Sequence, residues 1–189
     1  VMGRTDHAGT TPMRVRRDAL AGAARVVLAI RDQARGREDA SANVGVIRVA
    51  PGSSNVVPGV CELSIDLRAP SAAGVDALDE GCRAALRAIA EEEGLGLELA
   101  ETYRVPPASM AGELVELIEG AAAIEGASAA RMPSGAGHDA MVFAGRVPAG
   151  MLLVPSRGGV SHSPDEYSSP AQCEMGARVL ARAVAALVS

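Results

Sequence analysis

Apolar residues recur at helical spacing in four segments, with charged residues mostly on the opposite side. The predicted helices cover residues 18–35, 73–93, 110–125 and 170–188. Gly36 and Gly94 directly follow the first two segments, and glycine commonly ends a helix. Ser169 before Pro170 supplies a capping side chain and then the residue type favoured at the first helical position.

The segments between these helices predict strands. Residues 61–67 alternate between apolar and polar side chains, which indicates a strand with one face on a core and the other in water. Residues 43–49 and 95–99 predict further strands, and the first residues of the chain predict another. The apolar run at residues 151–154 does not alternate, as is typical of a strand buried on both faces.

The order of elements through Arg104 is β-α-β-β-α-β. This ferredoxin-like order is typical of a four-stranded antiparallel sheet with two helices on one face. Residues 104–107 then form a linker, and a single confident strand beyond it is too little for a doubly wound sheet. We therefore expect an α+β protein with domains at residues 1–105 and 106–189, the second of them incomplete.

Composition excludes several classes of function. The chain carries 23 acidic and 18 basic residues, the latter all arginine, and its net charge is −5, which is unfavourable for binding a nucleic-acid backbone. Aromatic residues make up 2 %, too few for base-stacking platforms. No apolar run approaches the ~20 residues that cross a bilayer, and no signal-peptide pattern is present. We expect a cytoplasmic protein without nucleic-acid or membrane partners, whose Cys61, Cys82 and Cys173 are reduced core thiols.

Four places hold more polar residues than structure requires: the segments around His7, Asn55 and Arg68, and the pair of loops at residues 133–140 and 158–166. Each also has a purely structural interpretation, because His7 and Asn55 suit turns and Arg68 suits a solvated sheet face. In the functional interpretation, the Arg68 guanidinium forms two charge-assisted hydrogen bonds with a carboxylate. Gly135 and Gly137 then precede a helix whose backbone N–H groups suit an anion.

All three histidines, His7, His138 and His162, lie in these segments. A catalytic zinc ion requires about three protein ligands and a water molecule. The chain has neither an HExxH nor an HxD motif that would supply them. The sequence by itself therefore does not complete a metal site.

Together these motifs resemble the M20 metallopeptidase clan, and within it the hydantoinase/carbamoylase branch of N-carbamoyl-L-amino-acid hydrolases, allantoate amidohydrolase and β-alanine synthase. The resemblance extends over nearly the whole chain, in the family's order. It rests on residues 3–13 (Gly-Arg-Thr-Asp-His-Ala-Gly-Thr-Thr-Pro-Met) with Arg17-Asp18-Ala19, on Pro51-Gly52 and residues 55–59 (Asn-Val-Val-Pro-Gly), on Asp66-Leu67-Arg68, on residues 133–140 (Pro-Ser-Gly-Ala-Gly-His-Asp-Ala), and on residues 159–166 (Gly-Val-Ser-His-Ser-Pro-Asp-Glu).

The resemblance implies a catalytic domain with two zinc or manganese ions, interrupted by a lid that also forms a homodimer. Residues 1–105 resemble the lid, and residues 106–189 the C-terminal part of an α/β zinc-peptidase-like catalytic domain. The implied roles concern a small ureido or N-carbamoyl carboxylate substrate. His7 would polarise its scissile carbonyl, Asn55 and Arg68 would bind it, the backbone of Gly135, Ala136 and Gly137 would assist, and His162 would be a metal ligand.

The family's other metal ligands and its general base lie upstream of the lid, in a segment that this chain does not contain. We therefore expect a fragment of an amidohydrolase that binds no metal tightly and does not turn over by itself. Two alternatives remain open from the sequence: another M20 activity, such as an aminoacylase or dipeptidase, and a non-catalytic dimerisation or binding module.

Overall fold

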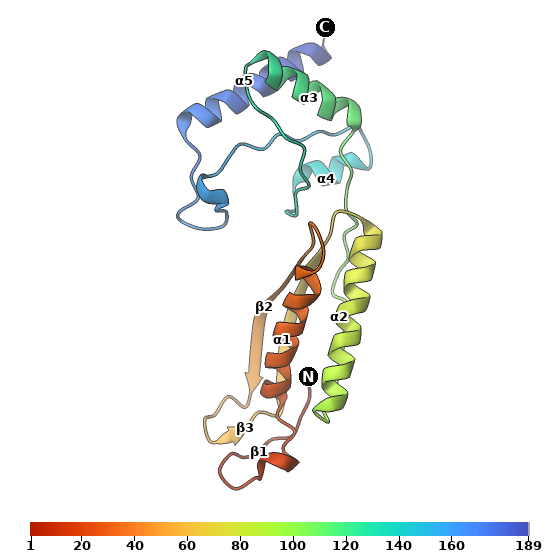
Figure 1. Ribbon diagram of the computed structural model, residues 1–189, viewed down its shortest axis with the longest axis vertical. Coiled ribbons are helices and arrows are strands. Elements are labelled where there is room, and N and C mark those ends of the chain that lie inside the picture. Colours follow the sequence, from red (N-terminus) through yellow and green to blue (C-terminus); the bar gives the residue numbers. More distant parts are fainter. Residues whose placement is uncertain (189) are drawn as a thin grey trace. The chain divides into compact units, whose positions relative to one another are not determined.

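The computed structural model describes residues 1–188 and contains both helices and strands. It divides into two compact units, Val1–Pro107 and Ala108–Ser189 (Figure 1). These are the first and the second unit. None of the helices within residues 1–188 is long and apolar enough to cross a membrane.

Two long helices, α1 (Ala19–Arg35) and α2 (Ala72–Glu92), lie in the first unit. Asp18 caps α1, because its side chain accepts hydrogen bonds from the amides of Leu20 and Ala21. Ser71 caps α2 by accepting from the amide of Gly74. Both predicted helices are thus confirmed to within one residue at each end.

The strands of the first unit form two separate antiparallel pairs. The long pair joins β2 (Ser41–Ala50) and β4 (Val60–Arg68), with an irregularity between Val44 and Val46. The short pair joins β1 (Asp6–His7) and β3 (Val56–Val57). A 3-10 turn, η1 (Met13–Val15), leads from β1 towards α1.

The expected four-stranded sheet is present only in part. Isolated bridges join Met2 to Val60 and to Gly96, but residues 95–99 form no further strand pairing. Pairing with the sheet stops after Gly3. The amide of the next residue, Arg4, donates to the carbonyl of Arg17 and not to a neighbouring strand. A strand requires a continuous row of such partners, and here only one bridge forms on that side.

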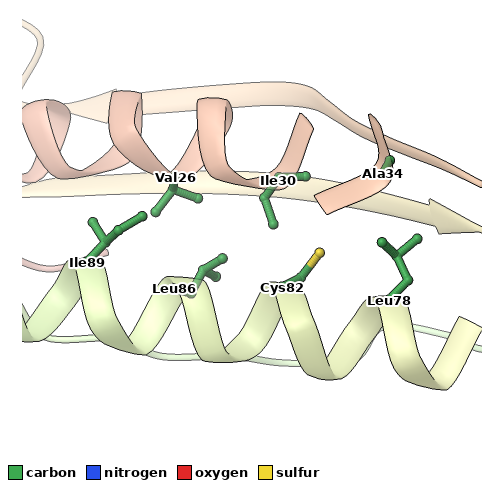
Figure 2. Close-up of a cluster of buried hydrophobic side chains, with 7 residues drawn as sticks. All are labelled: Val26, Ile30, Ala34, Leu78, Cys82, Leu86 and Ile89. Carbon is green, nitrogen blue, oxygen red and sulfur yellow. The ribbon is translucent and has the colours of Figure 1, made fainter. Parts of the chain in front are cut away.

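Both long helices pack on the same face of the β2–β4 pair. In the core between them, Val26, Ile30 and Ala34 of α1 face Leu78, Cys82, Leu86 and Ile89 of α2 (Figure 2). Leu63, Ile65 and Leu67 pack against this cluster from β4, which confirms the alternation read from the sequence. Complete burial of a side chain such as Ile30 or Leu78 contributes about 1.5–3 kcal/mol.

In the second unit, α3 (Gly112–Ile124) packs against α5 (Pro170–Leu187) through a small core of Ala121, Ala122, Val179 and Ala183. A short helix, α4 (Asp139–Ala144), and a 3-10 turn, η2 (Arg157–Gly159), lie between them in sequence. Ser169 and Gln172 form a capping box at the start of α5. The predicted helices are confirmed here too, to within two residues.

Two sequence predictions are wrong in the second unit. Residues 151–154 are not a strand, because an apolar run becomes one only beside a strand that shares its hydrogen bonds, and no other strand lies within residues 108–188. The thiol of Cys173 is exposed on α5, whereas Cys61 and Cys82 are buried in the first unit as expected. Burial raises the pKa of both buried thiols.

Candidate functional site

The short β1–β3 pair brings two predicted site residues together. His7 is paired with Val56, and the amide of the following residue, Ala8, donates to the carbonyl of Asn55 at 2.9 Å. His7 and Asn55 therefore lie at the ends of neighbouring strands, although 48 positions separate them in the chain (55 − 7). Both side chains are exposed.

The turn after β1 orients the His7 ring. The amides of Gly9 and Thr10 both donate to His7 Nδ1, at 3.0 and 3.2 Å. An imidazole nitrogen that accepts hydrogen bonds carries no proton, so the neutral ring bears its proton on Nε2. The exposed edge of His7 is therefore a hydrogen-bond donor.

Asn55 is held by a tight turn of its own. The Ser53 hydroxyl donates to Asn55 Oδ1 at 2.7 Å, which leaves the amide nitrogen of the side chain available as a donor. Gly52 precedes this turn with φ of +73°, a left-handed conformation that favours glycine. Both the turn and the β1–β3 pairing thus position Asn55.

Arg68 lies at the far end of β4 and forms a two-point ion pair with Asp66. Its Nε donates to Oδ1 at 2.7 Å and its terminal nitrogen to Oδ2 at 2.8 Å. These hydrogen bonds hold the pKa of Asp66 below its usual range, so the pair persists until the pH falls through that lowered pKa. Both side chains are more than 40 % exposed, and the ion pair therefore adds little to stability.

The structure does not bring Arg68 and His7 together. His7 lies beside β3, before the start of β4, and Arg68 ends β4. The eight steps from Val60 to Arg68 alone span roughly 26 Å at the usual strand rise. One small substrate molecule therefore cannot contact both side chains of the same chain.

The loop at residues 133–140 holds His138 by a local contact. Ser134 Oγ lies 2.9 Å from His138 Nε2 and also accepts from the amide of Ala136, at 3.3 Å. Gly135, Ala136 and Gly137 are exposed and precede α4. This helix has only six residues, so its dipole is small and the loop backbone is the main source of polar groups here.

His162 lies at the tip of a closed loop. Its φ is +56°, which is uncommon for a residue with a side chain, and its amide donates to Glu166 Oε2 at 2.9 Å. Arg157 and Tyr167 close the base of the loop, with the guanidinium 5.1 Å from the centre of the ring. The His162 imidazole is exposed.

The residues present do not complete a metal centre. Within residues 1–188, no three His, Cys, Asp or Glu side chains gather closely enough to hold a metal ion. His162 offers one imidazole, whereas a zinc site requires about three protein ligands. The described residues of this chain therefore supply too few ligands for a metal ion.

Arg16 is a structured polar residue that the sequence analysis did not single out. Its guanidinium donates from Nε to the carbonyl of Thr11 at 3.0 Å and from a terminal nitrogen to the carbonyl of Ala8. Both carbonyls belong to the turn that holds His7. No sequence pattern distinguishes Arg16, which binds this turn, from its neighbours Arg14 and Arg17.

Comparison with known proteins agrees with the resemblance seen in the sequence. The chain is 36 % identical over 188 residues to N-carbamoyl-L-amino-acid amidohydrolase of Paenarthrobacter aurescens, covering 99 % of the chain and 46 % of the relative. It is 38 % identical over 180 residues to allantoate amidohydrolase of Bacillus subtilis, covering 94 % of the chain and 43 % of the relative. The chain thus spans less than half the length of these relatives.

The structure is similar to that of a hydantoinase/carbamoylase family amidase from Burkholderia multivorans. The TM-score is 0.90 at 36 % identity, over 96 % of this chain and 44 % of the other. Residues 16–186 match peptidase family M20/M25/M40, whose members include metal-dependent hydrolases of carbon–nitrogen bonds. That match covers most of the chain, and the chain therefore belongs to peptidase family M20/M25/M40.

Proposed function

We propose that this chain is part of a metal-dependent amidohydrolase that cleaves linear carbon–nitrogen bonds of N-carbamoyl amino acids or allantoate-like ureides. The observation that carries the proposal is the His7 turn, which aims a hydrogen-bond donor outward beside Asn55. This turn occurs in a chain with relatives named N-carbamoyl-L-amino-acid amidohydrolase and allantoate amidohydrolase.

The two units have separate roles in this proposal. Residues 1–105 form a lid and dimerisation domain of ferredoxin-like order, and residues 106–189 form the C-terminal portion of the catalytic domain. The bridges from Met2 to Val60 and Gly96 support the lid assignment, because they place Met2 antiparallel beside β4 and Gly96 antiparallel beside Met2. The two helices on one face of β2 and β4 support it as well.

His7 acts on the scissile carbonyl group. When water adds to the ureido or amide carbon, negative charge develops on the carbonyl oxygen before the carbon–nitrogen bond breaks. A donor already aimed at that oxygen stabilises this charge without reorganisation. His7 Nε2–H is such a donor, and the amide nitrogen of Asn55 supplies a second hydrogen bond to the substrate.

Arg68 binds the carboxylate of the substrate, because a guanidinium matches a carboxylate with two charge-assisted hydrogen bonds. Since Arg68 and His7 of one chain are too far apart to contact one small molecule, a complete site requires two copies of the lid. We therefore propose a homodimer in which His7 reaches the site that contains Arg68 of the other subunit.

The loops of the second unit carry the remaining proposed groups. The backbone at Gly135, Ala136 and Gly137 binds the substrate, and His162 is one metal ligand in the intact enzyme. The two divalent ions, zinc or manganese, require further ligands from the rest of the protein. We expect this 189-residue chain alone to bind no stoichiometric metal, and elemental analysis after dialysis tests that expectation.

A substrate panel on the intact, metal-loaded protein tests the function. We expect hydrolysis of an N-carbamoyl-L-amino acid or of allantoate, and no hydrolysis of dipeptides or N-acyl amino acids. His7→Ala should lower kcat about 10²- to 10³-fold, the usual effect of losing one oxyanion donor. Metal content should remain unchanged in this variant, and Arg14→Ala serves as the control for a nearby exposed side chain.

The alternatives correspond to other outcomes of the same panel. Preferential cleavage of dipeptides or N-acyl amino acids would assign the protein to the aminoacylase or dipeptidase activities of the family. Absence of turnover on every substrate, in a protein that retains its metal, would indicate a binding or dimerisation module.

A further inference from the structure

The guanidinium of Arg16 binds the turn that carries His7, and Arg16 is not among the residues proposed above to contact the substrate. Its donors reach the carbonyls of Ala8 and Thr11, which lie on the two sides of the turn. The turn is also closed by the amide of Thr11, which donates to the carbonyl of His7 at 3.1 Å. Arg16 is half-buried, whereas its neighbours Arg14 and Arg17 are exposed.

The contact at Ala8 acts directly on the hydrogen bond to the histidine ring. The Ala8 carbonyl and the Gly9 N–H belong to one planar trans peptide group, so they point in opposite directions. When Arg16 holds that carbonyl on one side, the Gly9 N–H is held facing His7 Nδ1 on the other. Gly9 also permits this close approach, since a Cβ there would lie 3.2 Å from the ring carbon Cε1.

The charge of Arg16 strengthens the same hydrogen bond. No carboxylate within residues 1–188 forms an ion pair with Arg16, so its described partners are the two carbonyl dipoles. A charged donor on a carbonyl polarises the peptide group and makes its N–H a better donor, because hydrogen bonds in a chain reinforce one another. Arg16, the Ala8–Gly9 peptide and His7 thus form one continuous hydrogen-bonded series.

We propose that Arg16 is the positioning residue of His7. It holds the Gly9 amide on Nδ1, beside the amide of Thr10, and so keeps the proton of the neutral ring on Nε2, as a donor. The consequence for catalysis rests on the proposed function, whereas the structural effect on the ring does not.

Nuclear magnetic resonance of the 189-residue chain, labelled with ¹⁵N, tests the structural effect. A coupling across the hydrogen bond, between the Gly9 amide nitrogen and His7 Nδ1, is measurable only while that bond persists. We expect the coupling, and a single Nε2–H tautomer, in the wild type at mildly alkaline pH. Arg16→Met should abolish the coupling and give a mixture of tautomers, whereas the matched variant Arg14→Met should leave both unchanged.

A coupling that survives in Arg16→Met, or a wild-type ring protonated on Nδ1, overturns the proposal. If Arg16→Met does not fold, Arg16→Lys decides the question, because an ammonium group keeps the charge but lacks the planar fork that reaches two carbonyls. The coupling should then fall by at least half, and an unchanged coupling in this folded variant equally overturns the proposal.

Kinetics of the intact enzyme separate this inference from the proposed function. Arg16→Met should lower kcat with little change in KM, since it disturbs a group that acts on the developing charge. An intact protein without turnover contradicts the proposed function but leaves the ring measurements as the test of the Arg16 contact. If Arg16→Met loses the coupling but keeps the wild-type kcat, Arg16 still positions the ring, and only its proposed effect on turnover is overturned.

Discussion

The described hydrogen bonds of His7 and Arg68 give these two exposed side chains different properties. The ring of His7 accepts two backbone hydrogen bonds and is left with a donor edge. The guanidinium of Arg68 is held by both oxygens of Asp66, two positions earlier on the same strand. Both side chains are exposed, so burial does not distinguish them from ordinary surface residues.

Replacing Arg68 by Lys tests the proposed carboxylate contact. The ammonium group keeps the charge but loses the two-point geometry. One lost charge-assisted hydrogen bond costs about 1.5–3 kcal/mol, so we expect KM of the intact enzyme to rise roughly 10- to 100-fold with a small change in kcat. Arg48→Lys is the matched control, because Arg48 of β2 is also exposed and pairs with a carboxylate, that of Glu62 on β4. Equal KM values for wild type and Arg68→Lys would contradict the assignment.

At the scale of elements, a single carboxylate links α3 to α5. Glu125, directly after α3, accepts hydrogen bonds from Arg182 and Arg178 of α5, and its side chain is only 6 % exposed. Arg182, and then Arg178, lower the pKa of Glu125. The buried residues between the two helices are mainly alanines, so this ionic contact supplements a small core.

Stability of the second unit should therefore depend on pH through Glu125. Because its pKa is lower in the folded than in the unfolded chain, the stabilising contribution is complete above the unfolded value of about 4.3 and is lost as the pH falls through the folded pKa. Glu125→Gln should lower the thermal midpoint at neutral pH, and its difference from wild type should shrink in acid. Glu116→Gln, at an exposed position of α3, is the control. A pH-independent difference would exclude this mechanism.

At the scale of the whole molecule, the proposed site requires two chains. The β1–β3 pair and the far end of β4 place His7 and Arg68 apart within the first unit. In the proposed two-fold dimer, the first unit of each chain supplies His7 to the site that contains Arg68 of its partner, so this separation is no obstacle. The separation is therefore the structural reason for expecting a dimer.

Mixing two inactive variants of the intact enzyme tests this arrangement. In a dimer of His7→Ala with Arg68→Ala, one site receives both native side chains and the other receives neither. Random exchange of subunits should then restore about one quarter of wild-type activity in an equimolar mixture. If both residues served one site from the same chain, every mixed site would keep one defect and no activity would return. Light scattering should also give the dimer mass.

Much of the fold followed from the sequence because its signals are local. Apolar spacing and the caps at Asp18, Ser71 and Ser169 depend on residues a few positions apart, and the helices appear within two residues of their predicted ends. The alternation at residues 61–67 likewise reports which face of β4 is buried. These are properties of a short segment and its own side chains.

Pairing between distant segments was decided only by the tertiary structure. Residues 151–154 carry an apolar run but have no neighbouring strand within the second unit, and Met2 meets Gly96 in one bridge where a continuous strand pair was expected. The sequence was enough to select His7, Asn55 and Arg68 as candidate site residues, but it did not predict the distances between them. The tertiary structure also decided that Arg16, and not Arg14, holds the His7 turn. Hydrogen bonds form between atoms that meet in space, and this depends on where each side chain points after the chain folds back.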